Sequence, residues 1–336
     1  MNFEDVLLGI AIGDAFGAGL EFQDRDWIKA NVDFSKFINA RHLINTFDVD
    51  TNIFTKNYNE WDYTDDTEMT IGVINALLSK EQFSEELLLK HWTIEYNKGI
   101  KEKGYGRNGH GSMRWVFNGE KSIEEVRVFQ RDRKYPGNAP PMRAVPLGFL
   151  LSDDIDKYAI INADATHPHP KTRAASIIVA RATEYLLVKY ENSNKIISYC
   201  LKHIQGIDKE TADLLTLVNQ LPTPSELKEQ HYEVLCGKQP ITKPRFLPGI
   251  KGLPSDAMLT GACVLYVLKH STSAFDGLKN AIKIGGDVDS IASICTGILA
   301  GRYGIDSLPN FMVKNVEAKE KLRQLASTFQ DLILSH

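Results

Sequence analysis

The chain has 336 residues, of which 43% are hydrophobic and 24% charged, and a formal net charge of −4. These values are ordinary for a globular protein, and no basic run provides the positive surface that nucleic-acid binding requires. Glu4 and Asp5 stand where a signal peptide would be basic, and Asp14 interrupts the apolar stretch that follows. We therefore expect no signal peptide and no membrane span, and neither a membrane nor a nucleic acid as partner.

The four cysteines have no CxxC spacing, and Cys263 and Cys295 lie within apolar helical patterns. Buried thiols of this kind are typical of a reducing compartment. We therefore expect a cytoplasmic protein.

The first predicted helix covers residues 6–22. Within it three glycines recur every four residues: Gly9, Gly13 and Gly17. Glycine inside a helix costs about 1 kcal/mol relative to alanine, so this spacing indicates close packing against another helix. Asp14 and Glu21 are two turns apart and would share one face of this helix.

Residues 23–63 read as an ordered but irregular segment that leads to Thr64-Asp65-Asp66-Thr67, where acids and hydroxyls open a second helix over residues 66–80. A third helix is predicted over residues 85–98, with Ser84 as its N-cap. Between residues 104 and 111, four glycines expose backbone amides and allow close approach of a ligand. No strand precedes this loop, so the dinucleotide-binding fingerprint does not apply.

A turn-rich loop over residues 137–143 is followed by the sequence Thr166-His167-Pro168-His169-Pro170. Pro170 is well placed as the first residue of a helix that extends to about residue 190. Its first turn carries Lys171 and Arg173, which have the wrong charge for that end of a helix. Either the surface tolerates them or an anion binds there.

Periodicity predicts six further helices: three short helices in 193–236 broken at Gly206 and Pro222, one from the Ser255 cap to 270, and helices over 275–284 and 316–334. Residues 237–254 form a loop rich in proline and glycine. Alternation of period two is almost absent. The sequence thus predicts an all-α fold in one compact domain over residues 1–336.

The segment Gly285-Gly286-Asp287-Val288-Asp289-Ser290 directly precedes an apolar run spaced for one helix face. One short polar side chain suffices to cap a helix, and here there are two carboxylates and a hydroxyl. The Thr64–Thr67 segment has the same design, and we expect the two to converge. Mutual repulsion of their carboxylates would force proton uptake or cation binding. Oxygen ligands of this type suit Mg²⁺ or Mn²⁺ more than zinc.

In order along nearly the whole chain, these motifs resemble those of the ADP-ribosylglycohydrolases. The matching segments are Gly9-x-x-x-Gly13-Asp14-Ala15-x-Gly17-x-x-x-Glu21, Glu60-Trp61-x-x-Thr64-Asp65-Asp66-Thr67, the loop from Gly104 to Gly111, Gly137-Asn138 to Gly148, Thr166-His167-x-x-Pro170, and Gly285 to Ser290. The chain departs from the family pattern in having Ser290 where a threonine is usual, Ala139 with two prolines in the fourth motif, and Asn108 to Gly111 where relatives often carry threonines.

The resemblance implies a compact orthogonal multi-helix bundle with a dinuclear metal cleft. It implies hydrolysis of the glycosidic bond of an ADP-ribosyl group, on a protein or a small molecule, with release of ADP-ribose. Two Mg²⁺ or Mn²⁺ ions would be held by Thr64, Asp65, Asp66, Asp287, Asp289 and Ser290. The catalytic residues would be Glu21, Asp66 and Asp287. Substrate would contact Gly104, Tyr105, Gly106, Gly109, Gly111, Ser112, Asn138 and His167.

Two alternatives stay open. One is a two-metal phosphohydrolase that cuts the diphosphate of a nucleotide, and the other is an inactive ADP-ribose-binding module. We expect a monomer instead of an obligate oligomer.

Overall fold

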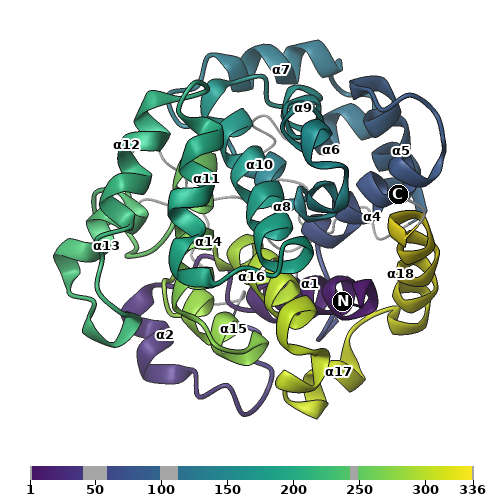
Figure 1. Cartoon of the computed structure of the whole chain (residues 1–336). Helices are drawn as coiled ribbons and strands as arrows, with labels where there is room; N and C mark the ends of the chain where they lie inside the picture. The colour runs from purple at the N-terminus through teal and green to yellow at the C-terminus, as the bar shows by residue number, and fades with distance from the viewer. Residues whose placement is uncertain (1, 41–58, 99–112, 243–248, 335–336) are drawn as a thin grey trace.

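The computed structural model describes residues 2–40, 59–98, 113–242 and 249–334. Within these ranges the regular elements are helices, and extended backbone pairs only at two isolated bridges, both involving Gly286 (Figure 1). The prediction of an all-α fold is confirmed. The predicted glycine-rich loop lies outside the described residues.

Two helices from opposite ends of the chain lie side by side in the middle of the bundle: α1 (Phe3–Ala18) and α16 (Val288–Tyr303). The glycine face of α1, formed by Gly9, Gly13 and Gly17, makes this contact. A methyl group added at Gly9 would lie 2.7 Å from Ala300 Cβ, and one at Gly17 would lie 2.5 Å from Asp289 Cα. The prediction of close helix packing is therefore confirmed, and the partner is the helix that carries Asp289.

The prediction that α1 extends to residue 22 is wrong. The helix ends at Ala18, and the Leu20 amide closes a tighter turn on the Gly17 carbonyl at 2.8 Å. Phe22 then takes a positive φ of 59°, which turns the chain away from the helix axis. Asp14 and Glu21 consequently do not share a helical face. Glu21 lies in the connection that follows α1.

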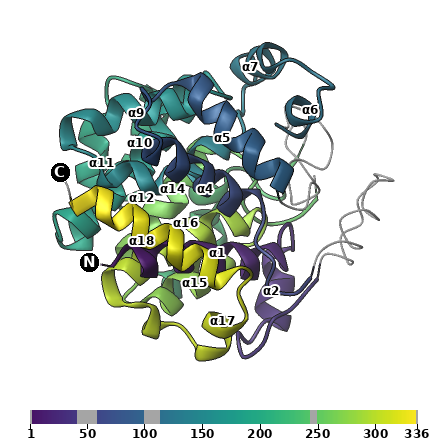
Figure 2. The same cartoon turned by 90° about the vertical axis from the view of Figure 1, so that its right-hand side faces the viewer.

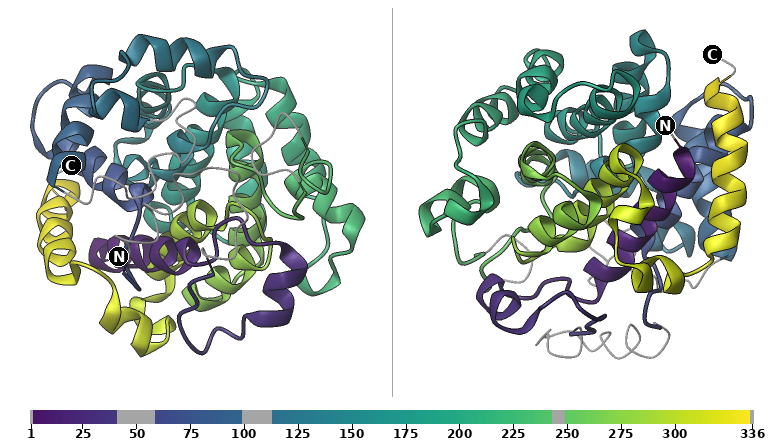
Figure 3. Two further views of the ribbon diagram at one scale, coloured as in Figure 1. Left: turned by 180° about the vertical axis from the view of Figure 1, so that it is seen from behind. Right: turned by 60° about the horizontal axis from the view of Figure 1, so that its bottom comes forward.

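Further helices surround the central pair (Figures 2 and 3). Among them are α4 (Asp65–Leu78), α10 (Pro170–Thr183), α14 (Ala257–His270), α15 (Ala274–Ile282) and α18 (Lys319–Leu334). The remaining α-helices are α2 (Arg25–Asn31), α5 (Glu85–Lys98), α6 (Met113–Phe117), α7 (Ile123–Arg131), α8 (Ala139–Met142), α9 (Ser152–Asp164), α11 (Ile196–Ile204), α12 (Lys209–Val218), α13 (Glu229–Cys236) and α17 (Asn310–Asn315).

Short turns of other helix types complete the bundle. Within the described ranges, η2 (Val145–Phe149), η4 (Ser193–Lys195), η5 (Pro224–Glu226) and η6 (Ile305–Ser307) are 3₁₀ turns, and η3 (Glu184–Val188) is a π-helical turn that prolongs α10. The buried apolar side chains of the described residues form one connected cluster. No helix in these ranges combines the length and the apolar character needed to cross a membrane.

Several predicted boundaries need correction. The segment expected to be irregular contains α2, which Asp24 caps by accepting a hydrogen bond from the Asp26 amide at 2.8 Å. The cap of α14 is Asp256 and not Ser255, because Asp256 Oδ1 accepts from the Leu259 amide at 3.0 Å. The last predicted helix, over residues 316–334, corresponds to α18 alone, which begins at Lys319, and α17 before it was not predicted. The cap on α5 is confirmed, since the Leu87 amide donates to Ser84 Oγ at 3.2 Å.

The prediction of buried thiols is also confirmed. All four cysteines are free and buried.

Candidate metal centre

The glycine pair before α16 has a backbone conformation that ordinary residues rarely adopt. Gly285 and Gly286 have φ values of +75° and +79°, in the left-handed region that favours glycine. Phe22 donates its amide to the Gly286 carbonyl at 2.7 Å. Leu253 donates its amide to Gly285 and accepts from the Asp287 amide, both at 2.8 Å. Three distant segments are thereby joined by backbone hydrogen bonds at the point where α16 begins.

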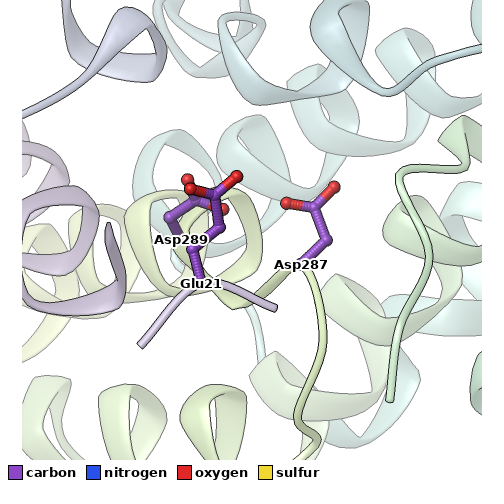
Figure 4. Close-up of side chains that lie close together, drawn as sticks. All are labelled: Glu21, Asp287 and Asp289. Carbon is purple, nitrogen blue, oxygen red and sulfur yellow. The ribbon is translucent and has the colours of Figure 1, made fainter. Parts of the chain in front are cut away.

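This junction brings three carboxylates together (Figure 4). Glu21, Asp287 and Asp289 each offer one oxygen, and these oxygens lie within 4.8 Å of one another. Asp287 occupies the N-cap of α16, yet its side chain makes no capping hydrogen bond. The simple interpretation that the acids only cap the helix therefore does not hold for Asp287.

Neutral donors hold the Asp287 carboxylate in place. The Asn138 side-chain amide donates to Asp287 Oδ2 at 3.1 Å, and the Ser255 hydroxyl also hydrogen-bonds to this carboxylate. Ser255 was expected to be a helix cap, and its contact with Asp287 was not foreseen. The signal was ambiguous, because Ser255 and Asp256 are adjacent and both residue types cap helices.

The second acidic segment begins α4 and meets the first. Thr64 is buried at the N-cap, followed by the half-buried Asp65 and the buried Asp66. Ser290 of α16 hydrogen-bonds to the Asp66 carboxylate. Among the described residues, Asp66 Oδ1 is buried and has no hydrogen-bond partner. The predicted convergence of the two segments is thus present, and it includes an acceptor that none of the described residues satisfies.

Electrostatics disfavour the ionised form of this cluster. Burial, followed by the charges of neighbouring carboxylates, raises the pKa of Asp65, Asp66 and Asp289 well above the ordinary value. Burial also raises the pKa of Asp287, where hydrogen bonds, including those from Ser255 and Asn138, oppose the effect. A cation would relieve the repulsion and satisfy Asp66 Oδ1. The candidate metal ligands are all oxygen atoms, so this group of side chains fits a hard divalent cation.

The predicted substrate-binding residues are only partly described. Gly104, Tyr105, Gly106, Gly109, Gly111 and Ser112 lie outside the described residues. Asn138 is directed to Asp287 and also donates to Thr260 Oγ1 at 3.3 Å. His167 is buried, with Nδ1 at 2.7 Å from Thr166 Oγ1, and a methyl group at Gly137 would lie 3.1 Å from its Nε2. His167 thus packs against the turn that carries Asn138, and substrate contact by either side chain stays a prediction.

The basic first turn of α10 already has acidic partners. Lys171 Nζ lies 2.7 Å from Glu210 Oε2, and Arg173 Nε lies 2.7 Å from Asp164 Oδ1. His169 caps the helix by accepting a hydrogen bond from the Lys171 amide at 3.1 Å. Of the two explanations for these charges, the ion pairs favour a tolerated surface over a bound anion.

The fold and the site together define an all-α helical bundle with a buried acidic cluster between two helix starts. The profile of the ADP-ribosylglycohydrolase family matches residues 2–335, and the chain belongs to this family.

Relatives and a solved structure agree with this assignment. The chain is 24% identical to ADP-ribosylhydrolase ARH3 of Homo sapiens over 345 residues, covering 97% of this chain and 92% of the relative. It is 27% identical to ADP-ribosylhydrolase ARH3 of Danio rerio over 291 residues, covering 80% and 77%. A solved ADP-ribosylglycohydrolase-related protein complex has a similar fold, with a TM-score of 0.57 and 17% identity over 99% of each chain. Family membership supports a hydrolase that acts at ADP-ribose linkages.

Proposed function

We propose that the protein hydrolyses the glycosidic bond between an ADP-ribosyl group and a protein or small molecule, and releases ADP-ribose. The observation that carries the proposal is the meeting of the two acidic segments at the hydrogen bond of Ser290 with Asp66, where one buried carboxylate oxygen has no partner within the described part of the chain. Two Mg²⁺ or Mn²⁺ ions would be held by Thr64, Asp65, Asp66, Asp287, Asp289 and Ser290.

When bound, such ions polarise substrate oxygens and lower the pKa of water. The side chains of the protein would supply the proton acceptor and the orientation of the carboxylates. Asp66 would bind a cation through Oδ1, which has no hydrogen-bond partner among the described residues, and would take the proton of the attacking water on its other carboxylate oxygen. Asp287 is held by Asn138 and Ser255, so its carboxylate keeps one orientation during the reaction.

Glu21 differs from the two aspartates beside it because it is only half-buried. We propose that it lies where substrate enters, and that it shares in holding a cation or gates access to the cluster. The bond to the ribose would break through an oxocarbenium-like transition state, as in other glycoside hydrolyses. The new hydroxyl stays on the ribose, and the proton lost by water ends on the leaving group.

The test is incubation with a panel of ADP-ribosyl substrates linked through arginine, serine, an acyl group or a nucleic-acid base. Free ADP-ribose, identified by mass spectrometry, is the expected product. AMP with ribose phosphate would instead identify a phosphohydrolase, and binding without turnover would identify an inactive binding module. Excess EDTA should abolish turnover, and Mg²⁺ or Mn²⁺ should restore it. Full activity in EDTA would contradict the metal requirement.

A matched pair of variants distinguishes loss of a carboxylate in the acidic cluster from loss of a carboxylate elsewhere in the chain. Asp66→Asn should abolish turnover, because a neutral amide neither attracts a cation as a carboxylate does nor takes up the proton of water. Asp208→Asn changes a carboxylate that caps α12 by accepting from the Thr211 amide at 2.8 Å, so it should retain turnover. Equal activity of the two variants would contradict the role of Asp66.

We further propose a cytoplasmic monomer. The four buried, free thiols support a reducing compartment. Light scattering of the purified chain would test the oligomeric state, and fractionation of the source cells would test the compartment.

A further inference from the structure

Asp14 lies inside α1 with no exposed surface, yet its carboxylate is fully used by another helix. Its Oδ1 accepts a hydrogen bond from the Thr64 hydroxyl at 2.6 Å. Its Oδ2 accepts from the Thr64 amide at 2.9 Å, from the Thr67 amide at 3.0 Å and from the Thr67 hydroxyl at 2.6 Å. Each carboxylate oxygen has two lone pairs, so the three donors on Oδ2 saturate that oxygen, and Oδ1 is committed to the Thr64 hydroxyl.

This arrangement replaces an ordinary helix cap. A threonine at the N-cap normally accepts a hydrogen bond from the amide two or three residues later. Thr64 holds the N-cap of α4 and makes no such bond. Asp14 reaches across from α1 and accepts the Thr67 amide in its place. A negative charge here also complements the positive end of the α4 dipole.

The consequence for Thr64 is a fixed hydroxyl. Its proton is donated to Asp14, so the lone pairs of Oγ1 are free for another partner. Had Thr64 capped its own helix, an amide proton would occupy one of them. The external cap therefore turns a capping threonine into an available oxygen ligand beside Asp65 and Asp66.

We propose that Asp14 is a positioning residue of the metal centre: it caps α4 from outside and orients the Thr64 hydroxyl so that its oxygen can bind a divalent cation. The inference rests on the proposed function, in which Thr64 is a ligand. It also explains the glycine face of α1, because Gly17 packs against Asp289 while Asp14 holds Thr64. The single helix α1 thereby fixes the position of the Thr64–Asp66 segment relative to the Asp287–Ser290 segment.

Asp14→Asn is the informative substitution because asparagine keeps the shape of aspartate and replaces one acceptor oxygen with a donor nitrogen. If the nitrogen faces Thr64, it donates to Oγ1 and occupies a lone pair. If it faces Thr67, it meets three donors and the cap of α4 is lost. Loss of a partner that orients a ligand typically costs 10- to 100-fold in metal affinity, so we expect the Mn²⁺ Kd to rise by about that factor.

The experiment titrates Mn²⁺ into the metal-stripped full chain by calorimetry, with urea unfolding of each stripped variant in parallel. Thr67→Val removes a hydroxyl from the same carboxylate and leaves the bond from Thr64 Oγ1. Thr183→Val removes a buried hydroxyl in α10 that donates to the Val179 carbonyl at 2.9 Å. Both controls should bind Mn²⁺ with nearly wild-type affinity, whatever stability they lose.

A Kd that rises only for Asp14→Asn supports the positioning role. An unchanged Kd, or a rise that follows the loss of stability across all three variants, overturns it. The wild-type titration tests the proposed metal centre on its own, and the ratio of variant to wild type tests Asp14. Wild-type protein that binds no Mn²⁺ would overturn both.

If Asp14→Asn does not fold, a crystal structure of the wild type with Mn²⁺ decides the matter. The expected arrangement has Thr64 Oγ1 bound to the ion on one side and hydrogen-bonded to Asp14 Oδ1 on the other. An ion bound directly by Asp14, or Thr64 outside the coordination shell, overturns the proposal.

Discussion

Gly286→Ala should damage the fold and the candidate metal centre together. The residue has a φ of +79°, and an added methyl group would collide with the backbone nitrogen and oxygen of Leu253. Those two atoms make the hydrogen bonds to Gly285 and Asp287 that join the site's segments. The substitution therefore combines backbone strain with the loss of two hydrogen bonds.

The expected loss of stability can be worked out from these parts. A left-handed conformation costs a non-glycine residue about 1–2 kcal/mol, and reduced freedom of the unfolded chain returns about 0.4–1 kcal/mol. Each lost backbone hydrogen bond adds about 1 kcal/mol. The sum is about 3 kcal/mol. For 336 residues the unfolding entropy is about 0.7 kcal/mol per kelvin, so Tm should fall by about 4 °C.

Gly119→Ala is the matched control. Gly119 has a φ of +72°, and an added methyl group would have no atom within 4 Å. The Gly119→Ala variant has the backbone strain without the collision, so its free energy of unfolding should fall by about 1 kcal/mol while its affinity for Mn²⁺ stays at the wild-type value. Thermal unfolding with EDTA measures the first quantity and calorimetric titration the second. Equal losses in the two variants would refute the role assigned to the junction at Gly286.

Three further predictions concern other parts of the molecule. Burial raises the pKa of Glu184, but hydrogen bonds, led by that from Arg181, bring it to about 2. Because this pKa is below the unfolded value of about 4.3, the ionised carboxylate stabilises the folded state above that pH, and this stabilisation is lost as pH falls toward 2. Glu184→Gln should therefore flatten the dependence of the unfolding free energy on pH by about 3 kcal/mol, measured by urea unfolding. Asn138→Ala removes a donor to Asp287 and should weaken Mn²⁺ binding about tenfold in calorimetry; unchanged binding would contradict the support role. Gly13→Val overpacks the glycine face and should cost about 1–3 kcal/mol or more in urea unfolding, and a stable variant would contradict the tight packing there.

The parts that sequence could predict depend on short-range patterns. The four-residue spacing of Gly9, Gly13 and Gly17 predicted a close helix contact because a glycine face has few other uses. The acids at the starts of α4 and α16 predicted a shared site because a single cap does not need so many carboxylates. The all-α class followed from helical periodicity along the chain.

The parts that sequence missed depend on tertiary contacts. No local pattern shows that Asp14 caps a helix other than its own. The end of α1 at Ala18 could not be placed, because glycines that allow helix packing also permit a helix to stop. Ser255 and Asp256 are equally good caps by residue type, and only the position of Asp287 decides which of them is left to hydrogen-bond with it.

The pairing of α1 with α16 has a consequence for how the protein is made. Asp14 and Thr64 leave the ribosome about 220 residues before Asp287 and Asp289. Until α16 emerges, α1 carries an unpartnered glycine face, and most of the stability of a helix in a protein comes from such packing. An incomplete chain therefore holds half of the acidic cluster and cannot gather the other. Cation binding would stabilise the folded protein by mass action, so metal would begin to favour folding only after the start of α16 has emerged.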